Sequence, residues 1–164
     1  MARKKKSTFT DDDDADLGFT YGQPLIVKSN YNGGEWVVVV ANGYNSTVAD
    51  GQVGTGDAVL YVLALDDGEL LAKINVGEGD LASPNGLSSP VAVSDFDVQH
   101  FANKTTGTDP DIWTADYIYA GDLQGNLWKF DLSSTNRSNW DAIKMYDTGS
   151  SQPITGKPGV GSFP

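Results

Sequence analysis

The chain has 164 residues, of which 39% are hydrophobic, a formal net charge of −11 at pH 7, and no cysteine. This length suffices for one ordinary domain with a core. The absence of cysteine excludes disulfides, thiolate metal sites and a cysteine nucleophile. An acidic surface repels the phosphates of nucleic acids and of anionic lipids, so we expect neither as a partner. Acidic side chains do attract divalent cations, so calcium stays among the candidate ligands.

Residues 1–16 form a charged lead, with a basic block at 1–6 and an acidic block at 11–14. Nothing in the lead could bury an apolar face, so we expect it to be disordered or a linker. The apolar run of about 7–15 residues that follows the basic start of a signal peptide is absent. We therefore expect either a cytosolic protein or a missing N-terminal part. No stretch approaches the roughly 20 apolar residues of a transmembrane helix.

From residue 17 onward, short β-branched and aromatic runs alternate with Gly, Asn, Asp and Pro, which is typical of strands and turns. The Asp66-Asp67-Gly68 sequence is a strong hairpin signal. Helical periodicity is absent, and only the polar loop 133–142 could hold a helical turn. The runs predict strands at 24–28, 35–41, 58–65, 70–76, 90–96, 117–120, 126–132 and 142–146.

Prolines at positions 24, 90 and 153 mark the starts of internal repeats. The residues around the first two prolines align, and those around the third begin another copy. Within the first two copies, residues 38–43 align with 117–122, and residues 60–66 align with 127–133. Because these segments match in the same order, chance alignment is a poor explanation. Four short antiparallel strands per repeat describe a β-propeller blade.

The sequence therefore predicts an all-β fold, a partial β-propeller whose quinoprotein-like blades each have four antiparallel strands. Within the propeller segment 17–164, blade one covers about 23–80, blade two covers about 89–147, and residues 152–164 start a third blade. Two blades cannot close a ring of about 4–8 blades. An open piece also leaves unpaired strand edges. We therefore predict that the chain is a fragment of a larger protein.

Four stretches, 16–24, 36–46, 84–90 and 119–132, resemble the C-terminal propeller of the PilY/PilC-type type IV pilus assembly and tip adhesin proteins. The resemblance covers roughly residues 16–160. It implies a non-enzymatic part of a large protein at the cell surface, at the pilus tip or in the periplasm of a Gram-negative bacterium. It also implies support of pilus extension, surface adhesion and twitching motility. The implied partners are other pilus components, such as minor pilins, and a host surface.

The resemblance also raises a calcium site, because several family members hold calcium in a D-x-D-x-D-G-x-x-D loop. Here Asp95 and Asp97 match the first two loop carboxylates and Asp116 matches the last. An insertion replaces the central D-G, and it carries Asp109 and Asp111 as candidate substitute ligands. Calcium takes about six to eight oxygens. Aspartates at strand ends also cap turns without any metal, so both interpretations stay open.

Two other classes of function stay open. A quinone-dependent dehydrogenase-type propeller would need a complete ring, a tryptophan stacked on the cofactor, calcium and usually paired cysteines. A generic protein-binding propeller scaffold would need none of these. His100 is the only histidine and no serine lies in a nucleophile-elbow pattern, so we expect no enzyme. Trp36 and Trp128 are predicted to pack between blades, whereas Trp113 is the candidate for exposure.

Overall fold

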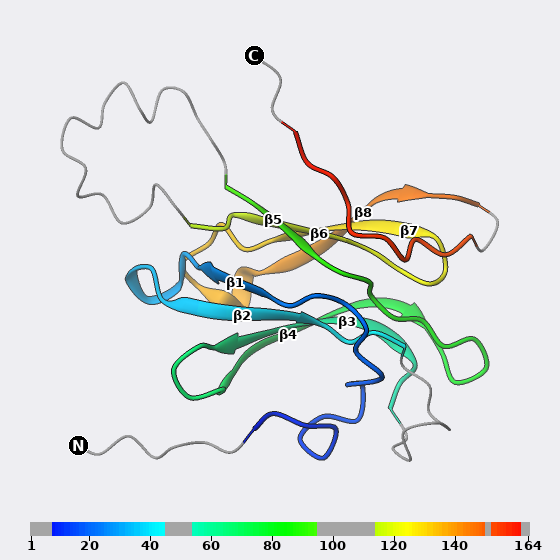
Figure 1. Cartoon of the computed structure of the whole chain (residues 1–164), viewed down its shortest axis with the longest axis horizontal. Helices are drawn as coiled ribbons and strands as arrows, with labels where there is room; N and C mark the ends of the chain where they lie inside the picture. The colour runs from blue at the N-terminus through cyan, green and yellow to red at the C-terminus, as the bar shows by residue number, and fades with distance from the viewer. Residues whose placement is uncertain (1–7, 45–53, 95–113, 150–151, 162–164) are drawn as a thin grey trace.

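The computed structural model describes residues 8–44, 54–94, 114–149 and 152–161. Within these residues the chain forms two four-stranded antiparallel sheets, with strand orders β1-β2-β3-β4 and β5-β6-β7-β8. Figure 1 shows the two sheets stacked on one another, with neighbouring strands following chain order in each sheet. These sheets are the predicted pair of blades, and the all-β prediction is confirmed.

The strands begin and end close to their predicted positions. Their β-branched and aromatic residues suit a pleated, half-buried surface. Blade one consists of β1 (Leu25–Lys28), β2 (Trp36–Ala41), β3 (Asp57–Ala64) and β4 (Leu70–Gly79). Blade two consists of β5 (Val91–Val93), β6 (Tyr117–Gly121), β7 (Asn126–Asp131) and β8 (Asp141–Asp147).

Two short 3-10 turns occur between strands within the residues that the structure describes. The turn Tyr31–Gly33 joins β1 to β2, and Asn32 within it has a left-handed φ of 51°. The turn Arg137–Asn139 lies inside 133–142, where the sequence allowed one helical turn. No helix in the described part of the chain is long and apolar enough to cross a membrane.

The strand register shows which residues of the two blades are equivalent, and it corrects the repeat alignment. Val39 pairs with Leu25 on one side and Val62 on the other, and Tyr119 holds the same place in blade two. The sequence alignment instead matched Val39 to Ile118, one residue away. Side chains along a strand alternate between its two faces with a period of two residues. The match of Ala41 to Ala120 gave a register that was wrong by one residue.

With this register, each blade has two comparable faces. We call upstream the face that carries Tyr61 and Lys73 in blade one and the equivalent Trp128 and Lys144 in blade two. The downstream face is the opposite one, and it carries Ile74 in blade one and the equivalent Tyr146 in blade two. The same register makes Asn42 at the end of β2 equivalent to Asp122 at the end of β6.

The hydrophobic core lies between the two blades. It joins the downstream face of blade one to the upstream face of blade two, as expected when blades are stacked in the same orientation around an axis. Its buried residues include Val37, Val39, Leu60, Val62, Ile74, Leu87, Ile118, Trp128, Phe130, Leu132 and Trp140. Trp128 therefore packs between blades as predicted. Trp36 does not, because its side chain is half exposed. Trp113 lies outside the described residues.

Residues 8–16 of the lead lie against β3 and β4 of blade one. The ring of Phe9 stands 5.2 Å from the ring of Tyr61, centroid to centroid. Asp16 is buried, although it belongs to an acidic run. The expectation of a disordered lead is therefore wrong for residues 8–16, because the fold supplies a lysine and hydroxyl donors for these carboxylates.

Candidate functional site

Of the five predicted calcium ligands, only Asp116 is among the described residues; Asp95, Asp97, Asp109 and Asp111 lie outside them. The side-chain amide of Asn30 in blade one donates to Oδ1 of Asp116, 2.8 Å away. The same amide also donates to the carbonyl of Leu132 at 3.2 Å. Asp116 thus contributes to a contact between the blades.

The described part of the chain does not assemble a metal site. It contains no group of three or more His, Cys, Asp or Glu side chains placed to hold an ion. One carboxylate, already bonded to an amide, does not provide the six to eight oxygens that calcium takes.

Among the described carboxylates of blade two, Asp122 accepts the most hydrogen bonds, and it is fully buried. Its Oδ1 accepts from the backbone N–H groups of Gln124 at 3.0 Å and Asn126 at 2.7 Å. Its Oδ2 accepts from the side chains of Asn85 at 2.9 Å, Asn126 at 2.8 Å and Trp128 at 2.8 Å. Such donors compensate the cost of burying a charge. Asp122 thereby fixes the turn between β6 and β7.

Asn85 lies in the interblade segment, residues 80–90, and bonds this segment to the β6–β7 turn. Its amide also donates to the carbonyl of Glu78 at 3.1 Å. Its carbonyl oxygen accepts from the backbone N–H groups of Leu123 at 3.1 Å and Gln124 at 3.2 Å. The interblade segment is therefore held against the β6–β7 turn by a buried side chain rather than by packing alone.

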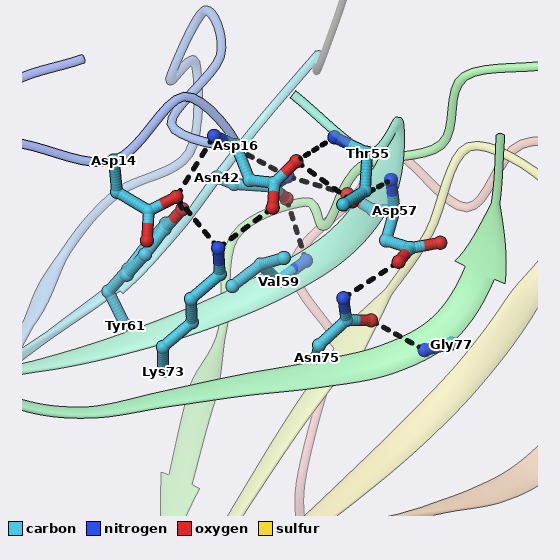
Figure 2. Close-up of polar contacts among 10 residues, drawn as sticks. All are labelled: Asp14, Asp16, Asn42, Thr55, Asp57, Val59, Tyr61, Lys73, Asn75 and Gly77. Atoms are coloured by element: carbon cyan, nitrogen blue, oxygen red, sulfur yellow. Dashed lines mark hydrogen bonds and ion pairs between the residues drawn. The ribbon is translucent and has the colours of Figure 1, made fainter. Parts of the chain in front are cut away.

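Asn42 in blade one occupies the position equivalent to Asp122, and both the nitrogen and the oxygen of its side-chain amide form hydrogen bonds. Its Nδ2 donates to the carbonyls of Asp16 at 3.0 Å and Asp57 at 2.9 Å. Its Oδ1 accepts from the N–H groups of Val59 at 3.1 Å and Leu87 at 3.0 Å. Figure 2 shows this side chain between the lead and β3. Through Leu87 it also reaches the segment that enters blade two.

Figure 2 shows the second polar cluster, in which the lead meets the upstream face of blade one. The ammonium of Lys73 lies 2.7 Å from Oδ1 of Asp14 and 2.8 Å from Oδ2 of Asp16. The hydroxyl of Tyr61 donates to Oδ1 of Asp14 at 3.1 Å. The other oxygen of Asp16 accepts from the N–H of Thr55 at 2.5 Å and from its hydroxyl at 2.8 Å.

These contacts change the acidity of two groups. Burial alone would lower the pKa of Lys73, but hydrogen bonds to Asp14 and Asp16 and the charges of those carboxylates raise it above its ordinary value of 10.5. Burial, then the charge and hydrogen bond of Asp14 and the charge of Asp16, raise the pKa of Tyr61 above 10.0. At neutral pH the cluster therefore holds a charged lysine and a neutral tyrosine.

Sequence reasoning missed Asp14, Asp16, Tyr61, Lys73 and Asn85 as residues that organise the structure. A signal for two of them was present. Once the register is known, Tyr61 and Lys73 align with Trp128 and Lys144, so an aromatic residue and a lysine recur at equivalent places. The acidic residues of the lead gave no such signal, because an acidic run reads as solvated surface.

Two antiparallel four-stranded blades joined through a mostly apolar interface define a segment of a β-propeller. The polar clusters described above hold blades, turns and the lead together. The chain belongs to the PilY1 β-propeller domain family, whose model matches residues 4–155.

Relatives of known name agree with this assignment. The chain is 35% identical over 143 residues to a type IV pilus biogenesis factor PilY1 homolog of Xylella fastidiosa. It is 37% identical over 121 residues to the type IV pilus biogenesis factor PilY1 of Pseudomonas aeruginosa. These alignments cover 87% and 74% of this chain, and 9% and 8% of the relatives.

A solved structure shows the same fold. The crystal structure of the Pseudomonas aeruginosa PilY1 C-terminal domain matches with a TM-score of 0.65 and 28% identity. The match covers 92% of this chain and 31% of that one. The chain therefore spans less than a tenth of the curated relatives it matches, and about a third of the solved domain.

Proposed function

We propose that this chain is a non-enzymatic propeller segment of a type IV pilus biogenesis factor, and that it serves pilus extension, surface adhesion and twitching motility. The observation that carries the proposal is family membership over residues 4–155. The relatives are named as biogenesis factors, and those names give no catalytic activity. The proposed location is the cell surface, the pilus tip or the periplasm, with minor pilins and a host surface as partners.

The chemistry of the two blades supports a scaffold role. Asn42, Asn85 and Asp122 are buried, and each is held by at least four hydrogen bonds within the fold. Side chains that already bond to backbone and to one another serve rigidity rather than proton transfer. The equivalent positions of Asn42 and Asp122 show that both blades use this device.

The test is an in-frame deletion of residues 17–155 from the gene of the complete protein in its own bacterium. We expect loss of surface pili and of twitching zones, with both restored by the wild-type gene. A matched variant, Lys144→Gln in the complete protein, should leave both intact because it removes only the partly exposed ion pairs to Glu78 and Asp147. Normal piliation and twitching in the deletion strain would contradict the proposal and favour a propeller scaffold unrelated to pili.

Calcium regulation is a separate part of the proposal, and it rests on Asp95, Asp97 and Asp116, with Asp109 and Asp111 as substitutes. Isothermal calorimetry of the whole chain with millimolar calcium should give saturable heat that Asp116→Asn weakens. Asn75, which belongs to β4 and bonds Asp57 of β3, offers a control: Asn75→Ser should leave the calcium heat unchanged. Absence of heat and of any thermal shift would remove calcium from the account.

A further inference from the structure

The lead contacts blade one in the same way as blade one contacts blade two, although the lead and blade one are unrelated in sequence. In blade two, the upstream face carries Trp128 and Lys144, and it is covered by blade one. In blade one, the upstream face carries Tyr61 and Lys73, and it is covered by residues 8–16 of the lead. The strand pairs Tyr61–Lys73 and Trp128–Lys144 hold the same register positions in β3–β4 and β7–β8.

The two lysines reach across their interfaces to acidic side chains. Lys144 places its ammonium 2.7 Å from Oε1 of Glu78, which belongs to β4 of the preceding blade. Lys73 places its ammonium 2.7 Å from Asp14 and 2.8 Å from Asp16, which belong to the lead. Each lysine is about one-third exposed at its side chain, whereas Asp16 is nearly buried. The lead therefore supplies the acidic groups that a preceding blade supplies elsewhere.

The aromatic residues of the two faces are buried to a similar degree. Trp128 is 4% exposed and lies in the core between the blades. Tyr61 is fully buried, and the neighbouring ring of Phe9 comes from the lead. The indole N–H of Trp128 donates to a carboxylate, that of Asp122, and the hydroxyl of Tyr61 donates to a carboxylate, that of Asp14.

We infer that residues 9–16 cap blade one in the place of a preceding blade, and that the Tyr61–Lys73 surface is a docking site for an acidic segment that bears an aromatic residue. A blade that buries aromatic and apolar side chains on both faces needs a neighbour on each, and here the lead covers the upstream face. The partner fitted by this surface is therefore defined by chemistry. It carries one aromatic ring and two carboxylates spaced two residues apart, as in Phe9, Asp14 and Asp16.

Hydrogen exchange of the whole chain, read by mass spectrometry, tests the cap. Residues 8–16 should be protected in the wild-type chain, and Lys73→Gln or the double variant Asp14→Asn, Asp16→Asn should speed their exchange at least about tenfold. Lys144→Gln is the matched control, and it should leave exchange of the lead unchanged. Wild-type exchange at the rate of a free peptide, or protection unchanged by Lys73→Gln, would overturn the cap.

The docking site is tested with a synthetic peptide of residues 8–18. Added to the double variant, in which the chain's own lead is weakened, it should restore the protection of β3 in a saturable way. The same peptide carrying asparagine at positions 14 and 16 should not. Failure of the native peptide at millimolar concentration, or equal protection by both peptides, would overturn the docking site.

Discussion

The two downstream faces of the molecule are built alike but surrounded differently. Ile74 and Tyr146 occupy equivalent places on β4 and β8, yet Ile74 is 7% exposed and Tyr146 is 59% exposed. Ile74 is covered by blade two. Around Tyr146, the side chains of Ile143 and Met145 are also half exposed or more. The upstream faces differ much less, because the lead covers blade one where blade one covers blade two.

This difference shows that the position of a residue in a blade does not determine its burial. A strand that carries apolar residues on both faces needs a packing neighbour on each face. In these blades the lead serves as one of those neighbours. The contribution of a side chain to stability is therefore expected to depend on its neighbour rather than on its place in the repeat.

The largest effect is expected at Ile74, the buried member of the pair Ile74 and Tyr146. Ile74→Ala should lower the free energy of unfolding by about 2–5 kcal/mol, because it leaves a cavity between the blades. The equivalent Tyr146→Ala should change it by less than about 0.5 kcal/mol, because the side chain is mostly in solvent. Urea unfolding of the whole chain measures both. Equal losses would contradict the burial difference.

The next effect concerns the equivalent polar positions. Asp122 only accepts hydrogen bonds, so Asp122→Asn would place an amide N–H₂ or a neutral oxygen among its donors and should cost about 1–3 kcal/mol. Asn42 donates two bonds to carbonyls, so Asn42→Asp would place a carboxylate against those carbonyls at a similar cost. Shifts in the midpoint of urea unfolding report both variants. A neutral result for either would show that its network is not rigid.

The lead should detach at high pH. The pKa values of Lys73 and Tyr61 are both raised in the folded chain, so the stability they give is fully present below about pH 10 and is lost as pH rises through the raised values. Absorbance of ionised tyrosine, followed with exchange of residues 8–16, measures the transition. Lys73→Met with Tyr61→Phe should remove the dependence of the lead on alkaline pH. Protection of residues 8–16 that falls at the same pH in the wild-type chain and in that variant would contradict this assignment.

The smallest effect is expected at the ion pair between the blades. Lys144 and Glu78 are both about one-third exposed or more, so Lys144→Gln should cost less than about 1 kcal/mol, and the cost should shrink in high salt. Thermal unfolding at low and high ionic strength separates this screened contribution from packing. A salt-independent loss would indicate that Lys144 acts through its contact with the Trp128 ring instead.

Much of the fold could be predicted because strand and turn signals are local. The prolines at 24, 90 and 153 and the Asp66-Asp67-Gly68 turn set the frame, and β4 ran only three residues past its predicted end at Val76. The register between repeats could not be read with the same certainty. A slip of one residue keeps an apolar strand apolar, and only pairing across the sheet reveals it.

The polar sites were less predictable, for a physical reason. Asp16 becomes a buried acceptor, and Asp14 a partly buried one, only because Lys73 and Thr55, far away in sequence, lie opposite them. The half-exposed Trp36 was misjudged because a tryptophan on a strand normally packs. For the calcium hypothesis, Asp116 was found in a contact with Asn30 between the blades, and the other four aspartates fall outside the described residues.

The most direct test of the central claim compares the exposure of the two kinds of face in one experiment. Hydroxyl-radical footprinting of the whole chain, read by mass spectrometry, should label Met145 and Tyr146 strongly while leaving Tyr61 and Trp128 protected. In the double variant Asp14→Asn, Asp16→Asn, labelling of Tyr61 should rise while Trp128 stays protected. Strong labelling of Tyr61 in the wild-type chain would contradict the claim that the lead covers blade one as blade one covers blade two.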